Sequence, residues 1–371
     1  MGKELLLEIG TEEIPAAFLP KALTDMDGLI RRELDANRIR YDAIRAMGTP
    51  RRLFLAVSGV AERQEDQVIE KLGPAKKVAF DGEGNPSKAA LGFCRGQGLE
   101  LSQLETTVTD KGEYLCARKS IIGEATEGIL PTILTKLITD IPFRKSMRWS
   151  DLEIRFARPI HWILALFDGR VIPLTIGNIE SGAVSRGHRF MNPAPFTVAN
   201  QEEYLAKTRE QCVIVDPAER KRIILEETQK AAAAVGGTVL HHEALLETVT
   251  FLTEYPTVVC GSFDREYLRL PQEVLITTMI SHQKYFPVLD ASGGHLLPHF
   301  LTINNTLARD PSVVRRGNEK VIRARLADAR FFFEEDRKIP LEKRVEDLKN
   351  VTFHTLLGSS YEKVMRFRKL A

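Results

Sequence analysis

Short apolar strand patterns alternate with amphipathic helix patterns along this chain, and this alternation constrains the fold more than any other feature. Residues 3–9 hold the run Leu5-Leu6-Leu7 and then Ile9, which is typical of a buried strand. Apolar residues next recur every three or four positions, which predicts one stripe of a helix packed on that strand. The stripe consists of Leu19, Leu23, Met26, Ile30 and Leu34. A mixed α/β fold is therefore expected.

The same patterns recur further along the chain. Residues 52–60 and 113–122 alternate like strands, 125–140 form a helix with a wide apolar face, and Asp216-Pro217 is a helix start. Residues 160–167 and 171–176 read as a hairpin around Asp168-Gly169. Alternation also predicts a strand that places Arg155 and Arg158 on opposite faces. Glu12 and Glu13 are expected near the start of the first helix, where its dipole explains them better than acid–base chemistry does.

The chain has 371 residues, which is too long for one ordinary core and predicts two or three domains. Residues 1–150 read as a mixed alpha/beta module. Residues 151–305 read as a second alpha/beta module, whose continuity with the first stays open. Residues 306–371, after a linker at Asn304-Asn305, read as helical, and their basic, unterminated end suggests that the chain stops inside a domain. The expected class is α+β, multidomain, with an all-helical C-terminal segment.

Composition describes a water-soluble protein. The apolar content is 43%, the charged content is 27%, and no stretch has the roughly 20 apolar residues that a membrane span needs. Because the N-terminus becomes acidic too early for a secretion signal, we expect a cytoplasmic protein without membrane contact. The four cysteines are widely spaced, so neither disulfides nor a structural metal is expected.

Charge is segregated although the formal net charge is only +2. Residues 1–28 hold six acids against two lysines, whereas 141–162 hold five bases against two acids and 309–325 hold six against two. Such segregation favours a local basic face that binds a polyanion. The acidic N-terminal segment is equally suited to a protein partner.

Two stretches combine these bases with aromatic rings: Lys145–Trp149 continuing into Arg155–Trp162, and Ser185–Phe190. Arginine interleaved with Trp, Phe and His neutralises phosphates and stacks on bases, so RNA is the first partner to consider. The alternative is that the rings are core and the arginines form a solvated rim, and composition alone does not separate the two.

The candidate RNA-binding residues follow from these stretches. They are Arg51, Arg52, Arg148, Arg155, Arg158, Arg186, His188 and Arg189. Each of them could instead pair with a carboxylate inside the fold, and Arg158, beside Pro159, is the most expected to do so. A second-rank set, spaced by seven residues on one helix face, is Arg316, Arg323, Arg330 and Arg337. Its alternative is a solvated face.

Motifs for catalysis are missing from the sequence. No Gly-x-x-x-x-Gly-Lys phosphate loop occurs, since His188 follows Gly187 where a lysine would be needed. The pairs His241-His242 and His295-x-x-x-His299 lack a third ligand, so no metal site is expected. We assign no catalytic residue and no cofactor to this chain, and the residues favour binding over catalysis.

Several longer motifs occur in order along the chain. They are Glu8-Ile9-Gly10-Thr11-Glu12-Glu13-Ile14-Pro15, Thr49-Pro50-Arg51-Arg52-Leu53, Lys145-Ser146-Met147-Arg148-Trp149, Phe156-Ala157-Arg158-Pro159-Ile160-His161-Trp162, Ser185-Arg186-Gly187-His188-Arg189-Phe190, Gly317-Asn318-Glu319-Lys320-Val321 and Arg325-Leu326-Ala327-Asp328-Ala329-Arg330-Phe331-Phe332-Phe333. Together these motifs resemble one known family, the bacterial glycyl-tRNA synthetase beta subunit, and the resemblance runs from end to end.

The resemblance implies a cytoplasmic heterotetramer of two alpha and two beta subunits that attaches glycine to tRNA(Gly) with ATP. In that family the alpha subunit holds the active site, with ATP and magnesium, and the beta subunit binds tRNA. The family also implies a C-terminal helical domain of the HD phosphohydrolase type, of which residues 306–371 would be the beginning. The anticodon-binding domain of the family has no counterpart here, and this chain alone is expected to be inactive.

Two other functions remain open at this stage. The chain could be a protein-interaction scaffold that docks the alpha subunit, through its acidic N-terminal segment, and contacts little RNA. Hydrolysis of mischarged tRNA is a third reading, which rests on domain analogy only.

Overall fold

The computed structural model describes residues 2–82 and 84–371 and divides the chain into two compact units. Unit 1 comprises Met1–Gly187 and Ala194–Glu210, and unit 2 comprises His188–Pro193 and Gln211–Ala371. Neither unit is one continuous stretch of sequence, because the short segment 188–193 belongs to unit 2. The domain boundaries predicted near residues 150 and 305 remain predictions.

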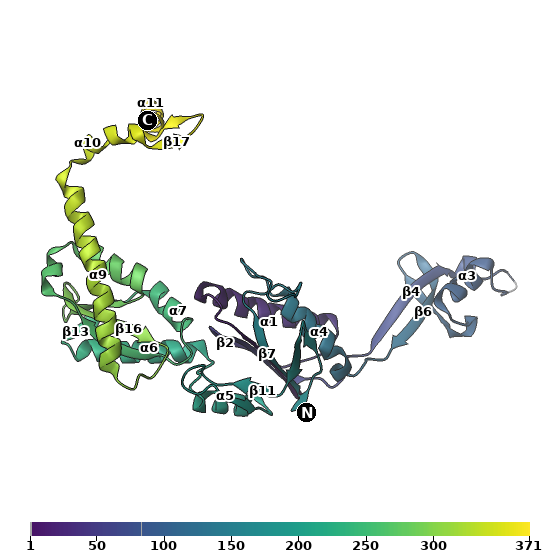
Figure 1. The fold of residues 1–371 in the computed structure, drawn as a ribbon. Coiled ribbons are helices and arrows are strands. Elements are labelled where there is room, and N and C mark those ends of the chain that lie inside the picture. Colours follow the sequence, from purple (N-terminus) through teal and green to yellow (C-terminus); the bar gives the residue numbers. More distant parts are fainter. Residues whose placement is uncertain (1, 83) are drawn as a thin grey trace. The chain divides into compact units, whose positions relative to one another are not determined.

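Unit 1 is built on a seven-stranded sheet in the order β2-β3-β1-β7-β10-β9, with β8 paired to β7 (Figure 1). The strands are β1 (Lys3–Thr11), β2 (Ala43–Thr49), β3 (Arg52–Val60), β7 (Ile160–Phe167), β8 (Arg170–Val171), β9 (Thr175–Ile176) and β10 (Ile179–Gly182). The N-terminal strand β1 lies near the centre, antiparallel to β3 on one side and to β7 on the other. This position explains its apolar sequence.

The two faces of this sheet carry different elements. Helix α1 (Leu19–Ala36) covers the face of the sheet on which Ile9 lies. Ile9 on β1 and Gly48 on β2 both stand opposite Leu53 on β3, so the three residues share one face. Leu23 of α1 lies against Gly48 on that face. Helix α4 (Thr126–Asp140) packs beside α1, and the Lys136 Nζ–Glu33 Oε1 distance is 2.6 Å. Helix α5 (Gln201–Glu210) lies on the opposite face, where Tyr204 reaches Glu8.

A second, three-stranded sheet of unit 1 is inserted between β3 and α4. Its order is β4-β6-β5, with β4 (Gln67–Ala75), β5 (Leu104–Thr109) and β6 (Gly112–Ile121). Helices α2 (Lys76–Ala79) and α3 (Lys88–Gln97) accompany it, and Ala79, Ala90 and Leu115 form its small apolar core. A two-stranded ribbon of β11 (Val184–Arg186) and β12 (Pro195–Thr197) completes the unit.

Unit 2 has a four-stranded sheet in the order β13-β15-β16-β14. Its elements are α6 (Pro217–Ala233), β13 (Gly237–Val239), α7 (Glu243–Thr250), β14 (Thr257–Ser262), α8 (Gln272–Thr277), the π-helix Thr278–Gln283, β15 (Phe286–Asp290), β16 (Leu296–Asn304) and α9 (Pro311–Lys338). Two apolar clusters form its core. One contains Phe300 from β16 together with Ile322 and Leu326 from α9, so the middle of α9 packs on the rest of this unit.

The segment after α9 is mostly helical but is not all-helical as expected. It contains α10 (Leu341–Arg344), a two-stranded sheet of β17 (Thr352–His354) and β18 (Gly358–Ser359), and α11 (Ser360–Leu370). In this hairpin Gly358 stands opposite His354 and adopts φ +80°, which favours glycine. The capping box of Ser359 then starts α11. The relation to an HD-type domain remains a prediction.

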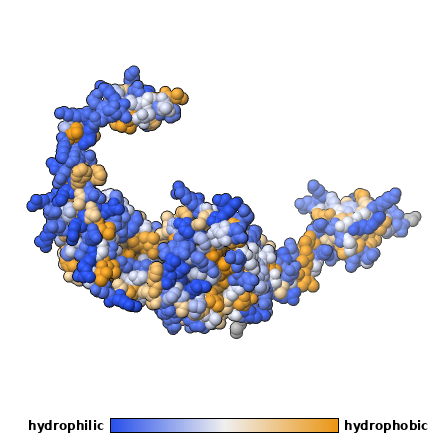
Figure 2. All heavy atoms as spheres, viewed as in Figure 1, coloured by the Kyte–Doolittle hydropathy of each residue, from blue (hydrophilic) through white to orange (hydrophobic). Residues whose placement is uncertain are grey.

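Apolar side chains of this last segment are exposed. None of the described side chains of α10 or α11 is buried, and Leu356 and Leu370 are 88% and 85% exposed. Figure 2 shows hydrophobic residues, in orange, at the surface of this part of the chain. The segment therefore has no core of its own.

Most predicted elements are confirmed. The strand 52–60 forms as expected, and so does the turn at Asp168-Gly169, with both turn residues at positive φ. The second arm of the hairpin is shorter than the predicted 171–176, because only Arg170–Val171 pairs with β7, while Thr175–Ile176 pairs with β10. Asp216 caps α6 through a bond from the Ala218 N–H at 2.9 Å. Among the described residues, no helix is long and apolar enough to cross a membrane.

Two local expectations are wrong. Glu12 and Glu13 do not start the first helix, because the 3-10 turn Ala16–Phe18 intervenes and α1 has Phe18 at its N-cap. Residues 155–158 do not form a strand either. Only Phe156 of these residues makes a bridge, to Met147, and no neighbouring strand among the described residues extends it. The ring of Phe156 is buried against Phe143.

Candidate nucleic-acid interface

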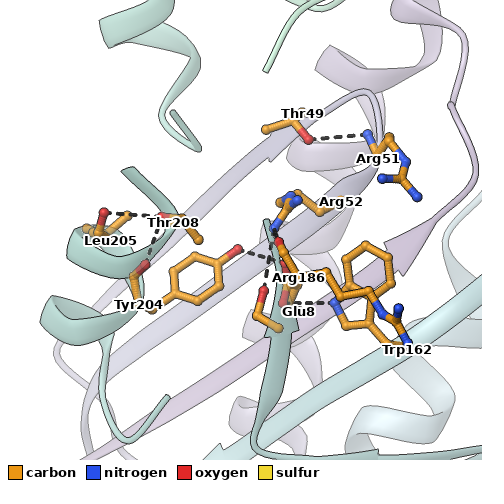
Figure 3. A network of polar contacts seen from close by, with 10 residues as sticks. Glu8, Thr49, Arg51, Arg52, Trp162, Arg186, Tyr204, Leu205 and Thr208 are labelled. Carbon is orange, nitrogen blue, oxygen red and sulfur yellow. Dashed lines mark hydrogen bonds and ion pairs between the residues drawn. The ribbon is translucent and has the colours of Figure 1, made fainter. Parts of the chain in front are cut away.

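A buried carboxylate organises the centre of unit 1 (Figure 3). Glu8 on β1 is fully buried and pairs with the equally buried Arg52 on β3, with 3.0 Å between Glu8 Oε1 and Arg52 Nη1. Tyr204 Oη donates to the same oxygen at 3.0 Å, and Trp162 Nε1 donates to Oε2 at 3.1 Å. Three separate elements thus contact one carboxylate. We call these four residues the Glu8 cluster.

Further hydrogen bonds hold the guanidinium of Arg52 in place. Its Nη1 donates to the backbone carbonyl of Arg186 at 2.9 Å, and Ser185 Oγ lies at 3.4 Å. Desolvation raises the pKa of Tyr204 well above its ordinary value, and the charge of Glu8 adds to this effect, so the phenol stays protonated as a donor. The ring of Tyr204 also stacks on Phe54, with 4.1 Å between centroids.

The indole of Trp162 lies between glycine backbone and arginine side chains. A Cβ added to Gly10 would lie 1.9 Å from Trp162 Cε2, so only glycine permits the ring to rest on β1. The guanidinium carbons of Arg51, Arg52 and Arg186 lie 5.8, 5.6 and 5.8 Å from the ring centroid. Of these, Arg186 is exposed. The Glu8 cluster therefore holds a flat ring with positive charge around it.

An irregular loop, residues 141–159, carries several exposed cations close together in sequence. We call it the basic loop. The edge-to-face contact between Phe143 and Phe156, at 4.8 Å between centroids, anchors it. Its exposed cations are Arg144, Lys145, Arg148 and Arg155. Arg148 pairs with Glu153 at 3.1 Å, whereas the part of the chain that the structure describes offers no carboxylate partner to Lys145 or Arg155.

Arg158 is not the buried pair that the sequence suggests. It is half-buried, and its Nη1 donates to the carbonyl of Ala157 at 2.8 Å. The buried ion pair is instead Arg52–Glu8. Its position follows from β3, which places Arg52 beside Gly10 and so leaves room for a large side chain over the sheet.

Unit 2 contains the other residues of the second basic-aromatic stretch. His188 is fully buried, and its Nδ1 accepts bonds from the backbone N–H groups of Phe190 and Met191, both at 3.3 Å. Arg189 lies over the ring of Phe190, which is 73% exposed. This corrects the expectation that Arg52 and His188 lie on an RNA-binding surface, because both side chains are buried in hydrogen-bond networks that support the fold.

The four arginines spaced by seven residues lie on α9 in different settings. Arg330 pairs with Glu266 at 3.0 Å and covers the ring of Tyr267, while Arg316 bonds to Ser312 and Arg337 lies over Phe333. Arg323 is exposed. The arginines therefore do not form a uniform line of available cations.

Sequence reasoning missed Glu8 and Tyr204. A single acid inside the apolar run of β1 is a signal, because buried carboxylates are almost always paired. No local pattern marks Tyr204, which lies 196 residues further along the chain. Arg144 and Lys145 were also absent from the candidates, although both are exposed in the basic loop, as Arg155 is.

Comparisons with known proteins agree with these motifs. A family model described as "Glycyl-tRNA synthetase beta subunit" matches residues 5–371. Two similar proteins, both named "Glycine--tRNA ligase beta subunit", come from Syntrophus aciditrophicus and Geotalea daltonii and are 68% and 58% identical over 371 residues. The alignments cover all of this chain and 54% of each relative. The chain thus spans about half the length of the curated relatives it matches.

Proposed function

Because the chain belongs to the glycyl-tRNA synthetase beta subunit family, we propose that it is a tRNA-binding, non-catalytic part of a glycine–tRNA ligase. In this proposal a separate alpha subunit binds ATP and magnesium and forms glycyl-tRNA. The chain contributes to an assembly of two alpha and two beta subunits in the cytoplasm. Its own task is to hold tRNA(Gly).

The observation that carries this proposal is the basic loop. Lys145 and Arg155 are exposed and have no carboxylate within the described residues to neutralise them, so both are available to phosphates. Trp149 lies between these two residues in sequence. Its side chain is half-buried and offers a ring for stacking. An irregular loop fixed by a buried aromatic pair is suited to this role, because loops on rigid scaffolds commonly carry binding residues.

The binding constant for tRNA(Gly) should fall as the salt concentration rises, and more steeply the more phosphates the chain neutralises. For each phosphate contact, log K falls by about 0.7 to 0.9 per unit of log salt concentration. A Lys145→Ala/Arg155→Ala double variant should therefore bind more weakly and have a slope shallower by roughly 1.5, if each side chain neutralises one phosphate. Filter binding across a salt series measures both.

The matched control is a cation that is already paired. Lys21 on α1 lies 2.7 Å from Asp25 and is exposed, so Lys21→Ala should leave the slope unchanged. Equal slopes for wild type and the double variant would remove the basic loop from the RNA interface. Salt-independent binding by the wild type would overturn the proposal itself.

The scaffold alternative predicts a different result. Charge reversal at Glu12 and Glu13 would then abolish co-purification with the alpha subunit, and the basic-loop variant would behave like wild type. Glu12 Oε2 lies 3.5 Å from His161 Nε2, so reversal also removes this contact within the fold. Melting curves of the variants distinguish lost docking from lost stability.

A further inference from the structure

A cavity of about 880 Å³ lies at the end of the three-stranded sheet of unit 1, and none of its lining residues belongs to the basic loop. Its walls come from α2, from the loop that follows it and from the turn between β5 and β6. The residues that the argument uses are Lys76, Lys77, Phe80, Asp81, Lys111 and Glu113. The volume falls in the range of sites that bind a compact small molecule.

Positive charge exceeds negative charge in this cavity. Lys76 pairs with Glu113 at 2.8 Å, so these two charges neutralise each other. The Asp81 carboxylate accepts bonds from the backbone N–H and the side-chain amide of Asn85. Lys77 and Lys111 are exposed, and in residues 2–82 and 84–371 their ammonium groups have no hydrogen-bond or ion-pair partner. Two ammonium groups are therefore available to an anion.

The cavity also presents a flat apolar surface. Phe80 is half-buried and packs against the cluster of Ala79, Ala90 and Leu115, which fixes its position. The same ring lines the cavity beside Ala75. An aromatic ring held from behind is a stacking platform, and stacking tolerates any base because every base has a π-face.

We propose that this cavity binds one unpaired ribonucleotide, with its base on Phe80 and its phosphate between Lys77 and Lys111. The inference rests on the proposed function, because it names an additional part of the RNA that the chain would hold. The volume of the cavity fits a single nucleotide, whereas an acidic peptide would need an extended groove. Lysine suits the phosphate, since it binds phosphate as a point charge.

The test uses the whole chain and a fluorescein-labelled, single-stranded hexaribonucleotide, followed by fluorescence anisotropy. Lys77→Ala/Lys111→Ala should weaken binding about tenfold or more, the usual effect of losing hydrogen bonds to a charged group. The matched control is Lys71→Ala/Lys88→Ala, which removes two exposed lysines of the same module outside the cavity and should change affinity by less than about twofold. Phe80→Ala should also weaken binding, and a melting curve shows whether it remains folded.

Competition identifies the ligand. Adenosine 5′-monophosphate should displace the hexaribonucleotide at concentrations where inorganic phosphate does not. Equal displacement by phosphate would overturn the proposal and leave an anion site only. Equal affinities of the two lysine double variants would also overturn it. Salt-dependent tRNA(Gly) binding by the wild type in either case would leave the proposed function intact, whereas its absence would refute that function separately.

Discussion

Glu8 shows how one side chain can depend on residues that are distant in sequence. Its two oxygens accept from Arg52, Trp162 and Tyr204, which come from β3, β7 and α5. The acid in an apolar strand indicates that a partner exists, but it does not identify the partner. Strand register decides that, because Gly10 stands opposite both Arg52 and Trp162. Register is a tertiary property, and the sequence patterns do not contain it.

Glu8→Gln should lower the free energy of unfolding by about 3–5 kcal/mol, the cost of leaving a buried charge without its partner. The amide keeps one acceptor oxygen but replaces the other with a donor, which faces the donors of Trp162 or Arg52. Urea unfolding followed by far-ultraviolet circular dichroism measures the loss.

The control at this scale is an exposed ion pair. Asp25→Asn removes the partner of Lys21 on α1 and should cost less than about 1 kcal/mol. A Glu8→Gln variant as stable as Asp25→Asn would show that the buried pair contributes no more than a surface pair.

At the scale of elements, the sequence predicted the turns and helix caps whose geometry depends on a few neighbouring residues. The turn Asp168-Gly169 and the cap Asp216 were identifiable because their backbone geometry depends on the residues themselves. Residues 155–158 alternate in polarity like a strand but have no neighbouring strand to pair with, so alternation alone misled. A strand requires a partner, and no pattern within four residues supplies one.

The segment 339–371 should be the first part of this chain to be cut by trypsin. Described side chains of α10 and α11 are not buried, so local opening costs little there. Helix α6 has trypsin sites at Lys221, Arg222 and Lys230 but buries Arg220 and Ile224, and it should resist longer. Mass spectrometry of an early time course gives the order. Simultaneous cleavage in α6 and α11 would contradict this expectation.

At the scale of the whole molecule, the units are assembled from discontinuous sequence. Residues 194–210 belong to unit 1 because Tyr204 stacks on Phe54 and bonds to Glu8. Composition and linker signals predict each domain boundary as a single position along the chain. A boundary of that kind cannot place α5 in unit 1, because residues 188–193 of unit 2 precede it in sequence. The membership of each unit depends on long-range contacts that no sequence pattern contains.

A chain of residues 1–210 should unfold cooperatively, whereas a chain of residues 1–187 should not. The shorter chain lacks α5, so the Glu8 face of the sheet loses Tyr204 and Phe54 becomes uncovered. Thermal melts of the two fragments by circular dichroism test this difference. Equal melting temperatures would mean that α5 docks on a sheet that is already stable.

The setting of Trp162 also gives the protein an intrinsic optical reporter. The chain has two tryptophans, and this one rests on Gly10 within 6 Å of three guanidinium carbons. Indole emission shifts with the electric field across the ring. A polyanion that draws Arg186 away from the ring would therefore change the emission wavelength of Trp162. With Trp149 replaced by phenylalanine, the arrival of a ligand at this surface could be followed in real time without any attached dye.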